Sequence, residues 1–397
     1  MRSKDMNKLT VKDMDFSGKR VIMRVDFNVP LNDAQEVTDD ARIEAALTTI
    51  KYILEKNPKR LILMSHLGRP KGKVVDSLRM DPVAERLAKL IGQQVKKLND
   101  CVGEKVANEI EGSSAKVFLL ENLRFHPEEE KGDEGFAKQL ASLADVYVND
   151  AFGTAHRAHA STTLIAKYLP CCVGFLMEKE LDYLSKVTYS PEKPFVAILG
   201  GAKVSDKIEV VENLFRKVDR ILIGGAMAYT FLKSRGEAVG SSLVEEDKLD
   251  LARDLLKKAE ELKVEMVLPV DHIVVESLEN PDTKKQVVDI EAGYKAVDIG
   301  QRTIELFEEK LKDAKTVLWN GPLGIFENPS YARGTKEIAQ FLTSLNAVVV
   351  VGGGDSASAA KKFGVKDKLS HVSTGGGASL EFMEGKPLPG VAAIPDK

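Results

Sequence analysis

Short apolar runs recur along the whole chain, and each is followed by a polar loop and then a stretch with helical spacing. In the first half they are VIMRV at 21–25, RLILMS at 60–65, KVFLL at 116–120 and DVYVN at 145–149. In the second half they are FVAIL at 195–199, RILI at 220–223, EMVL at 265–268, TVLW at 316–319 and VVVV at 348–351. Strands that alternate with helices predict βαβ units and mostly parallel sheets. The expected fold class is therefore α/β.

A single amphipathic stretch at 173–188 separates the two sets of strands. Its apolar residues fall at helical spacing, and the prolines of SPEKP at 190–194 end the pattern. At 397 residues the chain also exceeds what one hydrophobic core usually supports. We therefore predict two domains joined by a helix, the alternative being that this helix is simply one more packed helix.

Composition narrows the class of partner. The formal net charge of −3 gives no overall attraction to nucleic acid or to a membrane surface, and no apolar run approaches the length of a membrane span. The first twenty residues have no apolar core of a signal peptide. Three cysteines suit a reducing compartment, and their spacing predicts neither a disulfide framework nor a zinc site. We expect a cytoplasmic protein.

The loops after the first four strands are basic. They contain RVDFNVP, SHLGRP, ENLRF and NDAFGTAHRAHAS, and Arg42 follows the first of them. In open parallel sheets ligands bind outside the carboxyl ends of the strands. Arginine there suits recognition of carboxylate or phosphate. The first half is expected to bind a small, multiply negative molecule, and the alternative is a set of surface ion pairs.

The loops of the second half carry glycine instead: GGAKVSDK, GGAM, NGPLGIFE and GGGDS. Lys203 and Lys207 are four residues apart and are expected on one face of a helix start. Ser356 is expected to cap the helix after the last turn. Glycine turns with nearby lysines suit a polyphosphate. The Asp355 carboxylate would repel phosphates bound by these amides unless a cation such as Mg²⁺ lay between them. By itself this turn is equally compatible with a Mg-nucleotide site and with a plain βα connection.

Eight motifs in order carry a resemblance to a known family. They are RVDFNVP, SHLGRP, ENLRF, NDAFGTAHRAHAS, GGAKVSDK, WNGPLGIFE, GGGDSASAA and STGGGASLE. From about residue 19 to residue 391 the chain resembles phosphoglycerate kinase. The resemblance implies two Rossmann-like three-layer domains with parallel sheets, facing across a cleft and joined by an interdomain helix. The domains are expected at 1–172 plus 380–397 and at 189–379, with the helix at 173–188.

The resemblance also implies the site residues. 3-Phosphoglycerate is expected to contact Asp26, Phe27, Asn28, Arg42, His66, Leu67, Gly68, Arg69, Arg124 and Arg157. ATP or ADP is expected to contact Gly201, Ala202, Lys207, Gly225, Gly293, Asn320, Pro322, Gly324, Glu327, Gly353, Gly354, Asp355 and Ser356, with Asp355 holding Mg²⁺. Arg42, Lys203, Gly376 and Gly377 are expected to act on the transferring phosphoryl group. The sequence departs from the family pattern near the adenine, at Lys295 and Gln301.

The implied reaction is reversible phosphoryl transfer between ATP and the carboxylate of 3-phosphoglycerate, in a monomeric enzyme of glycolysis and gluconeogenesis. Hinge closure is expected near residues 170–194 and at Ser373 and Thr374. Two alternatives remain. An NAD-dependent dehydrogenase would use the fingerprint Gly352, Gly354, Ala357, but it wants an acid about 20 residues on, and that window has none. A non-catalytic two-lobed anion-binding protein would explain the arginines but not the lysines and Asp355.

Overall fold

The computed structural model describes residues 7–397, which form two compact units. The first runs to Asp182 and includes Pro387–Lys397, and the second is Tyr183–Lys386. The second unit therefore keeps residues 380–386, which the sequence had assigned to the first domain. These residues belong to α13 (Gly377–Met383) and its exit, where the Met383 carbonyl accepts a hydrogen bond from Asn213 of α7 (Ile208–Leu214).

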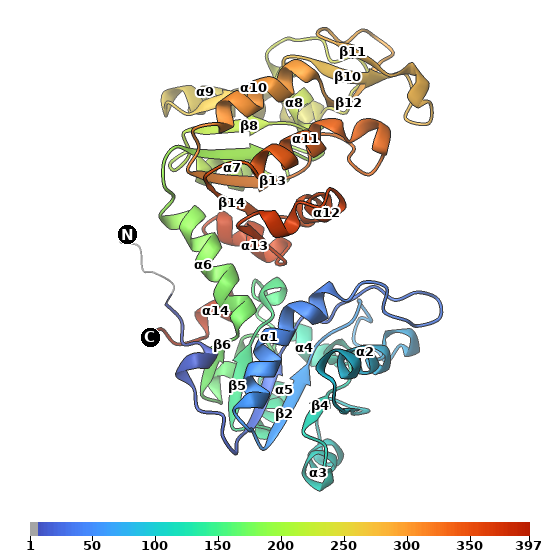
Figure 1. Cartoon of the computed structure of the whole chain (residues 1–397), viewed down its shortest axis with the longest axis vertical. Helices are drawn as coiled ribbons and strands as arrows, with labels where there is room; N and C mark the ends of the chain where they lie inside the picture. The colour runs from blue at the N-terminus through green and yellow to red at the C-terminus, as the bar shows by residue number, and fades with distance from the viewer. Residues whose placement is uncertain (1–6) are drawn as a thin grey trace. The chain divides into compact units, whose positions relative to one another are not determined.

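The first unit is built on a six-stranded parallel sheet in the order β3-β4-β2-β1-β5-β6. Its strands are β1 (Arg20–Arg24), β2 (Arg60–Met64), β3 (Val95–Lys97), β4 (Val117–Leu119), β5 (Val146–Asn149) and β6 (Cys171–Val173). Its helices are α1 (Ala41–Glu55), α2 (Asp81–Ile91), α3 (Glu104–Gly112), α4 (Pro127–Lys131), α5 (Glu134–Ser142) and α14 (Pro389–Ala392), which Figure 1 shows packed around the sheet. The four predicted strands are confirmed. The two edge strands, β3 and β6, were not predicted. Each has only three residues, and VKK of β3 is only half-buried.

The second unit repeats this plan with the strand order β15-β14-β13-β7-β8-β9. Its strands are β7 (Phe195–Leu199), β8 (Arg220–Ile223), β9 (Glu265–Val267), β13 (Thr316–Asn320), β14 (Val348–Val351) and β15 (His371–Val372). Its other helices are α8 (Met227–Ser234), α9 (Leu249–Glu261), α10 (Gln301–Leu311), α11 (Arg333–Leu342) and α12 (Gly354–Lys362). The parallel α/β fold class predicted from the sequence is confirmed.

A small antiparallel sheet in the second unit was not predicted. It has the order β11-β10-β12 and consists of β10 (His272–Val275), β11 (Lys285–Val287) and β12 (Lys295–Ile299). Its outer strand KQV is short and polar, and the pairing of β10 with β12 is irregular between Ile273 and Val274. A regular two-residue alternation, which is the usual sequence signal of such a sheet, is therefore weak here.

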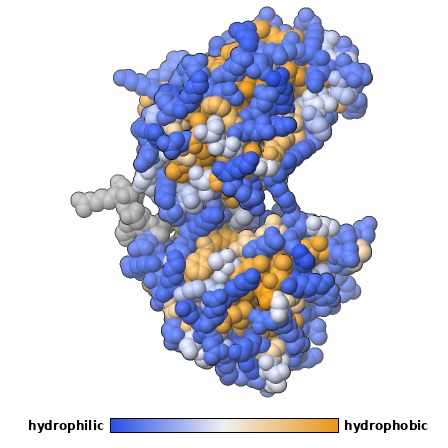
Figure 2. Space-filling model, viewed as in Figure 1, coloured by the Kyte–Doolittle hydropathy of each residue, from blue (hydrophilic) through white to orange (hydrophobic). Residues whose placement is uncertain are grey.

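Burial explains why the apolar runs become central strands. All five residues of β7 and of β13 are buried, and Val349–Val351 of β14 are buried as well. A parallel sheet covered by helices on its faces hides both sides of each inner strand, so continuous apolar runs suit it. The face drawn in Figure 2 is mostly hydrophilic with smaller apolar areas. Among the described helices, none combines the length and the apolar character needed to cross a bilayer.

The stretch between the two sets of strands forms α6 (Phe175–Tyr189), which begins two residues later than predicted because Val173 still belongs to β6. Its first turn is held by the buried carboxylate of Asp150, whose Oδ1 accepts a hydrogen bond from the Met177 amide at 3.0 Å. Gly174 makes room for this contact, since a Cβ there would lie 2.3 Å from the Asp150 carboxyl. The other oxygen, Oδ2, has no hydrogen-bond partner among the described residues.

This buried carboxyl predicts a pH-dependent stability. Burial raises the pKa of Asp150 from 3.8 to about 7. Because the folded state binds this proton more tightly, the group's contribution to the free energy of unfolding is complete below about pH 4 and is lost as pH rises through about 7. Asp150→Asn keeps an acceptor for the Met177 amide and removes the charge. We expect urea unfolding to show that the free energy of unfolding of the variant, relative to that of the wild type, increases from pH 4 to pH 7 by an amount on the order of a few kcal/mol.

Asp13→Asn is the control for this measurement. Hydrogen bonds from Thr10 and Lys397 lower the pKa of Asp13 to about 2, so its contribution is lost only on acidification below its ordinary value of 3.8. The difference between wild type and Asp13→Asn should therefore stay constant from about pH 5 to pH 7. Parallel curves for wild type and Asp150→Asn over the same range would show that Asp150 does not titrate there.

Candidate functional site

The site in the first unit is organised by Arg24, the last residue of β1, whose side chain is buried. Its Nε donates to Ser161 Oγ at 2.9 Å, and its Nη2 lies 3.1 Å from His66 Nδ1. A guanidinium group can only donate hydrogen bonds. Nδ1 of His66 must therefore accept, which leaves the imidazole proton on Nε2.

The pKa of His66 reflects the burial and the positive charge of its surroundings. Its pKa is held well below 6.5, first by burial and then by the guanidinium groups of Arg24, Arg124, Arg42 and Arg157. Arg24 contacts the neutral imidazole directly, and the other three arginines act on it electrostatically, although the four come from three different strand ends and a helix start. A neutral imidazole presenting an N–H beside several cations is suited to bind an anion.

The remaining polar groups hold the loops in place. Asp26 accepts from Arg42 Nη1 at 2.6 Å, and Asn28 Oδ1 accepts from the Gly68 amide at 2.8 Å. Arg124 Nη1 donates to the Gly68 carbonyl at 3.0 Å, and its Nε lies 3.2 Å from Glu130. Two strand ends, after β1 and β2, are in this way tied to each other and to the loop after β4.

A surface hollow of about 400 Å³ opens beside these loops. Asn28, Leu67 and Gly68 form part of its wall together with residues of the 29–35 loop and Ser77 and Leu78. Space for a small molecule therefore adjoins residues that the sequence assigned to the substrate.

The other expected substrate residues fall into two groups. Arg69 is exposed, and no described residue forms an ion pair with it. Arg157 is half-buried, and its Nε donates to His156 Nε2 at 3.2 Å. In contrast, the side chains of Phe27 and Leu67 are in the core, and their amides are already bonded to Ser65 Oγ and Asn122 Oδ1. These two residues therefore shape the loops rather than offer a free group to a ligand.

Sequence reasoning did not select several polar residues that the site uses. Ser161 Oγ donates to Glu129 Oε1 at 2.6 Å, so Arg24 is connected through one hydroxyl to a buried carboxylate. Burial raises the pKa of Glu129, while Arg24 acts in the opposite direction. The available signal was an arginine inside the apolar run VIMRV, because an arginine in a central strand is rarely buried without a partner.

The glycine loops of the second unit interlock through their backbones. The Gly201 amide donates to the Pro322 carbonyl and the Gly225 amide to the Leu323 carbonyl, each at 3.0 Å. A Cβ on Gly225 would lie 2.6 Å from the Gly201 backbone. The strand ends of β7, β8 and β13 can approach this closely only because glycine stands there.

Lys207 and Asn320 form the polar centre of these loops. Lys207 Nζ donates to Asn320 Oδ1, and Asn320 Nδ2 donates to the Gly352 carbonyl at 3.0 Å. Burial lowers the pKa of Lys207, against the pull of Asp206, Asp355 and Glu384. Both lysines precede α7, which begins at Ile208, so the prediction that they share a face of the helix start is wrong. The chain forms a turn between Gly201 and Lys207, so helical geometry begins only at Ile208.

The start of α12 also differs from expectation. Gly353, at φ +90°, is its N-cap, and no side chain caps the helix. Ser356 lies inside the first turn, and its hydroxyl accepts from the Gly321 amide at 2.6 Å, so the prediction that it caps α12 is wrong. The first amides of α12 consequently have no side-chain cap, and Asp355 beside them is exposed. Amides at a helix N-terminus attract anions.

The remaining expected nucleotide residues are spread over further loops. Ala202 and Gly293 are exposed. Glu327 is exposed, and its carbonyl accepts from Lys362 Nζ at 2.8 Å. Gly324 packs against Asp298, which a Cβ would approach to 2.3 Å, so its absent side chain has a structural reason. Gly376 is the N-cap of α13, which begins at Gly377, and no heavy atom of a described residue outside 375–377 lies within 4 Å of where a Gly376 Cβ would stand.

Comparisons with known proteins agree with one another. The sequence model of the family described as phosphoglycerate kinase matches residues 11–386. The chain is 56% identical to the phosphoglycerate kinase of Dictyoglomus turgidum, with 98% of each chain covered, and 56% identical to that of Pseudothermotoga lettingae, with 99% and 100% covered. A phosphoglycerate kinase structure from Coxiella burnetii matches with a TM-score of 0.88 at 39% identity, covering 97% of this chain and 98% of that one.

The His66 environment predicts a signature in ¹⁵N NMR of histidine-labelled protein. Without ligand, we expect His66 to show the neutral tautomer with the proton on Nε2 and no titration near pH 6.5. A multiply negative ligand bound beside these guanidinium groups should raise the pKa of His66. His66→Gln identifies the resonance. A ligand-free His66 signal with its midpoint at 6.5 would contradict the proposed cationic surroundings.

Proposed function

The chain belongs to the phosphoglycerate kinase family, and from this premise we propose how its residues divide the work of the family reaction. The protein is a phosphotransferase with a carboxyl group as acceptor (EC 2.7.2.3). It transfers a phosphoryl group reversibly between ATP and the carboxylate of 3-phosphoglycerate, giving 1,3-bisphosphoglycerate and ADP, as in glycolysis and gluconeogenesis. We propose that it acts as a monomer in the cytoplasm.

The reaction requires no general base. A carboxylic acid has a pKa near 4, so the acceptor carboxylate is already ionised at neutral pH. What the protein must supply is alignment of the reactants and neutralisation of charge on the transferring group. Cationic side chains and free backbone amides can supply this neutralisation.

We assign 3-phosphoglycerate to the first unit. The observation that carries this assignment is the neutral His66, which Arg24 contacts and on which the charges of Arg124, Arg42 and Arg157 act. Arg24 holds the imidazole with Nε2–H as a donor, while Arg42, Arg69 and Arg157 offer cations whose charge is only partly offset by Asp26. Burial of Arg24 and Arg124 reduces solvent screening and strengthens their attraction for an anion.

We assign Mg-ATP or Mg-ADP to the second unit. Asp355 is an exposed carboxylate beside the uncapped amides of α12, and no described residue forms an ion pair with it. This donor set fits Mg²⁺, which binds through one or two carboxylates together with substrate phosphates. Bound there, the metal would neutralise phosphate charge. Lys207, held by Asn320, and the amides after Gly353 are positioned to bind phosphate oxygens.

The groups proposed to act on the transferring phosphoryl are Lys203, Arg42 and the amides at Gly376 and Gly377. Lys203 is exposed, and no described residue forms a hydrogen bond or ion pair with its ammonium group. A cation without a hydrogen-bond or ion-pair partner among the described residues is available to a charge that develops during the reaction. The alternatives of a dehydrogenase and a non-catalytic binding protein receive no support from the comparisons.

Asp355→Asn tests the metal assignment. We expect isothermal titration calorimetry to show much weaker binding of Mg-ADP and almost unchanged binding of 3-phosphoglycerate, since the neutral amide loses the charge that attracts Mg²⁺. Asp367→Asn, another acid at a short helix start in the same unit, serves as the control. Equal affinity of wild type and Asp355→Asn for Mg-ADP would remove Asp355 from the metal site.

Lys203→Ala tests the catalytic assignment. In a coupled assay of ATP- and 3-phosphoglycerate-dependent acyl phosphate formation, we expect kcat to fall by about 100-fold or more with little change in either KM. Lys368→Ala, at another exposed lysine of this unit, should leave kcat unchanged. If nucleotide affinity falls while kcat is preserved, Lys203 contacts the ground state, and Lys207 becomes the better candidate for the catalytic lysine.

A further inference from the structure

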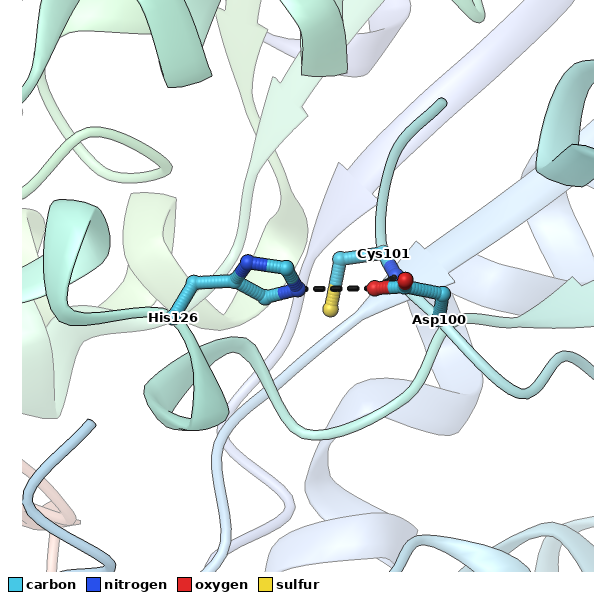
Figure 3. Close-up of side chains that lie close together, drawn as sticks. All are labelled: Asp100, Cys101 and His126. Carbon is cyan, nitrogen blue, oxygen red and sulfur yellow. Dashed lines mark hydrogen bonds and ion pairs between the residues drawn. The ribbon is translucent and has the colours of Figure 1, made fainter. Parts of the chain in front are cut away.

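A cluster of three metal-binding side chains lies outside the sites described above. Asp100 and Cys101 follow β3, and His126 follows the short helical turn Leu123–Phe125 after β4. One ligand atom from each residue lies within 4.8 Å of the other two. Strands β3 and β4 are parallel neighbours, so their carboxyl ends bring the two loops together. Figure 3 shows the Cys101 sulfur beside the contact between the His126 ring and the Asp100 carboxylate.

The three groups converge on one point. His126 Nε2 lies 2.7 Å from Asp100 Oδ1, and the Cys101 thiol lies on the same side of the ring (Figure 3). In a nucleophilic cysteine–histidine–acid arrangement the acid binds the ring nitrogen opposite to the one that activates the nucleophile. Here acid and thiol approach the same nitrogen. The Cys101 thiol is also fully buried and donates to the Glu121 carbonyl at 3.0 Å, so it is not poised as a nucleophile.

Two features hold this geometry in place. Asp100 Oδ1 accepts from the Cys101 amide at 2.7 Å, which fixes the carboxylate over its own turn. The His126 ring packs on Phe136 with ring centroids 4.9 Å apart. The neighbouring Glu121 carboxylate is already bonded to Lys97 at 2.6 Å and to Arg79 at 3.0 Å. Glu121 therefore contributes its backbone carbonyl to this cluster and keeps its side chain elsewhere.

We propose that Asp100, Cys101 and His126 form a binding site for a thiophilic divalent cation of the Zn²⁺ type. One sulfur, one imidazole nitrogen and one carboxylate oxygen are the ligands that Zn²⁺ takes, at about 2.0 to 2.3 Å each. Mg²⁺ prefers an octahedral set of oxygens, so this site differs in chemistry from the one assigned to Asp355. Asp100 and His126 retain exposed side-chain fractions of 56% and 28%, which leaves room for a water as fourth ligand and for small adjustments.

Binding requires that two protons move. The thiol proton, now donated to the Glu121 carbonyl, leaves to solvent as the metal–sulfur bond forms. The imidazole proton shifts from Nε2, where it faces Asp100, to Nδ1, which frees the Nε2 lone pair for the metal. Nothing is oxidised or reduced. The metal would cross-link the loop after β3 to the start of α4, just past Arg124 of the triose site.

Sequence spacing had predicted no zinc site. The usual signal is a pair of ligands close together in each of two short motifs. Here one ligand pair is adjacent and the third ligand stands alone far along the chain, so only the pairing of β3 with β4 brings them together.

Cobalt(II) titration of the full-length, chelator-treated protein without nucleotide tests the proposal. Co²⁺ replaces Zn²⁺ at such sites, and a thiolate ligand gives a charge-transfer band in the near ultraviolet. We expect one equivalent of Co²⁺ to produce this band and Zn²⁺ to abolish it. Cys101→Ser should remove the band. Loss of an outer-shell partner typically lowers metal affinity by about 10- to 100-fold. Asp100→Asn and His126→Asn remove direct ligands, so each should weaken Co²⁺ binding by at least that factor.

The variants are chosen so that unfolding does not obscure the result. Asp100 and His126 are partly exposed, and asparagine suits position 126 because that residue is the N-cap of α4. These two variants decide the question even where Cys101→Ser is unstable. Cys171→Ser, which alters a thiol in β6, should leave the band unchanged. A wild type without the band, or Asp100→Asn and His126→Asn binding Co²⁺ like the wild type, would overturn the proposal.

Discussion

The first unit depends on a positive charge that is kept out of water. The Arg24 guanidinium is buried at the end of a central strand, where an unpaired charge is costly. Its partners are a hydroxyl, a carbonyl and an imidazole, and the balancing carboxylate of Glu129 lies one hydroxyl away. Because Ser161 accepts from Arg24 and donates to Glu129, the charge is compensated without a direct ion pair. The same arrangement fixes which nitrogen of His66 carries the proton, so a constraint of folding becomes a property of the anion site.

The loops of the second unit are joined mainly through backbone contacts. Three strand ends approach so closely that side chains are excluded, and glycine at 200, 224, 225 and 321 allows it. Lys207 and Asn320 then tie this core of loops to Gly352 at the end of β14. The uncapped start of α12 follows directly. Two units with the same α/β architecture thus present different groups at their strand ends, buried cations in the first unit and uncapped amides with an exposed carboxylate in the second.

Buried aspartates recur as anchors for helix starts. Asp150 receives the Met177 amide of α6, Asp271 the Thr303 amide of α10, and Asp298 the Gly334 amide of α11. In each of these three places a glycine, Gly174, Gly300 or Gly334, lies where a side chain would collide with the carboxyl. Burial raises the pKa of both Asp150 and Asp298 to about 7, so these anchors carry a desolvation cost that hydrogen bonds only partly offset.

The sequence by itself determined the α/β class, the two sets of parallel strands and the chemistry of the loops at their ends. Apolar runs and glycine turns are local signals, because strand and helix periodicity acts over a few residues. Tertiary structure decided the rest. Arg24 meets Ser161, Lys207 meets Asn320 and Cys101 lies beside His126 across long stretches of chain. Which hydroxyl caps a helix and which one joins a buried network depends on neighbours from other strands, as the shift of Ser356 from expected cap to Gly321 partner shows. Such contacts follow from strand order and burial, which no local pattern encodes.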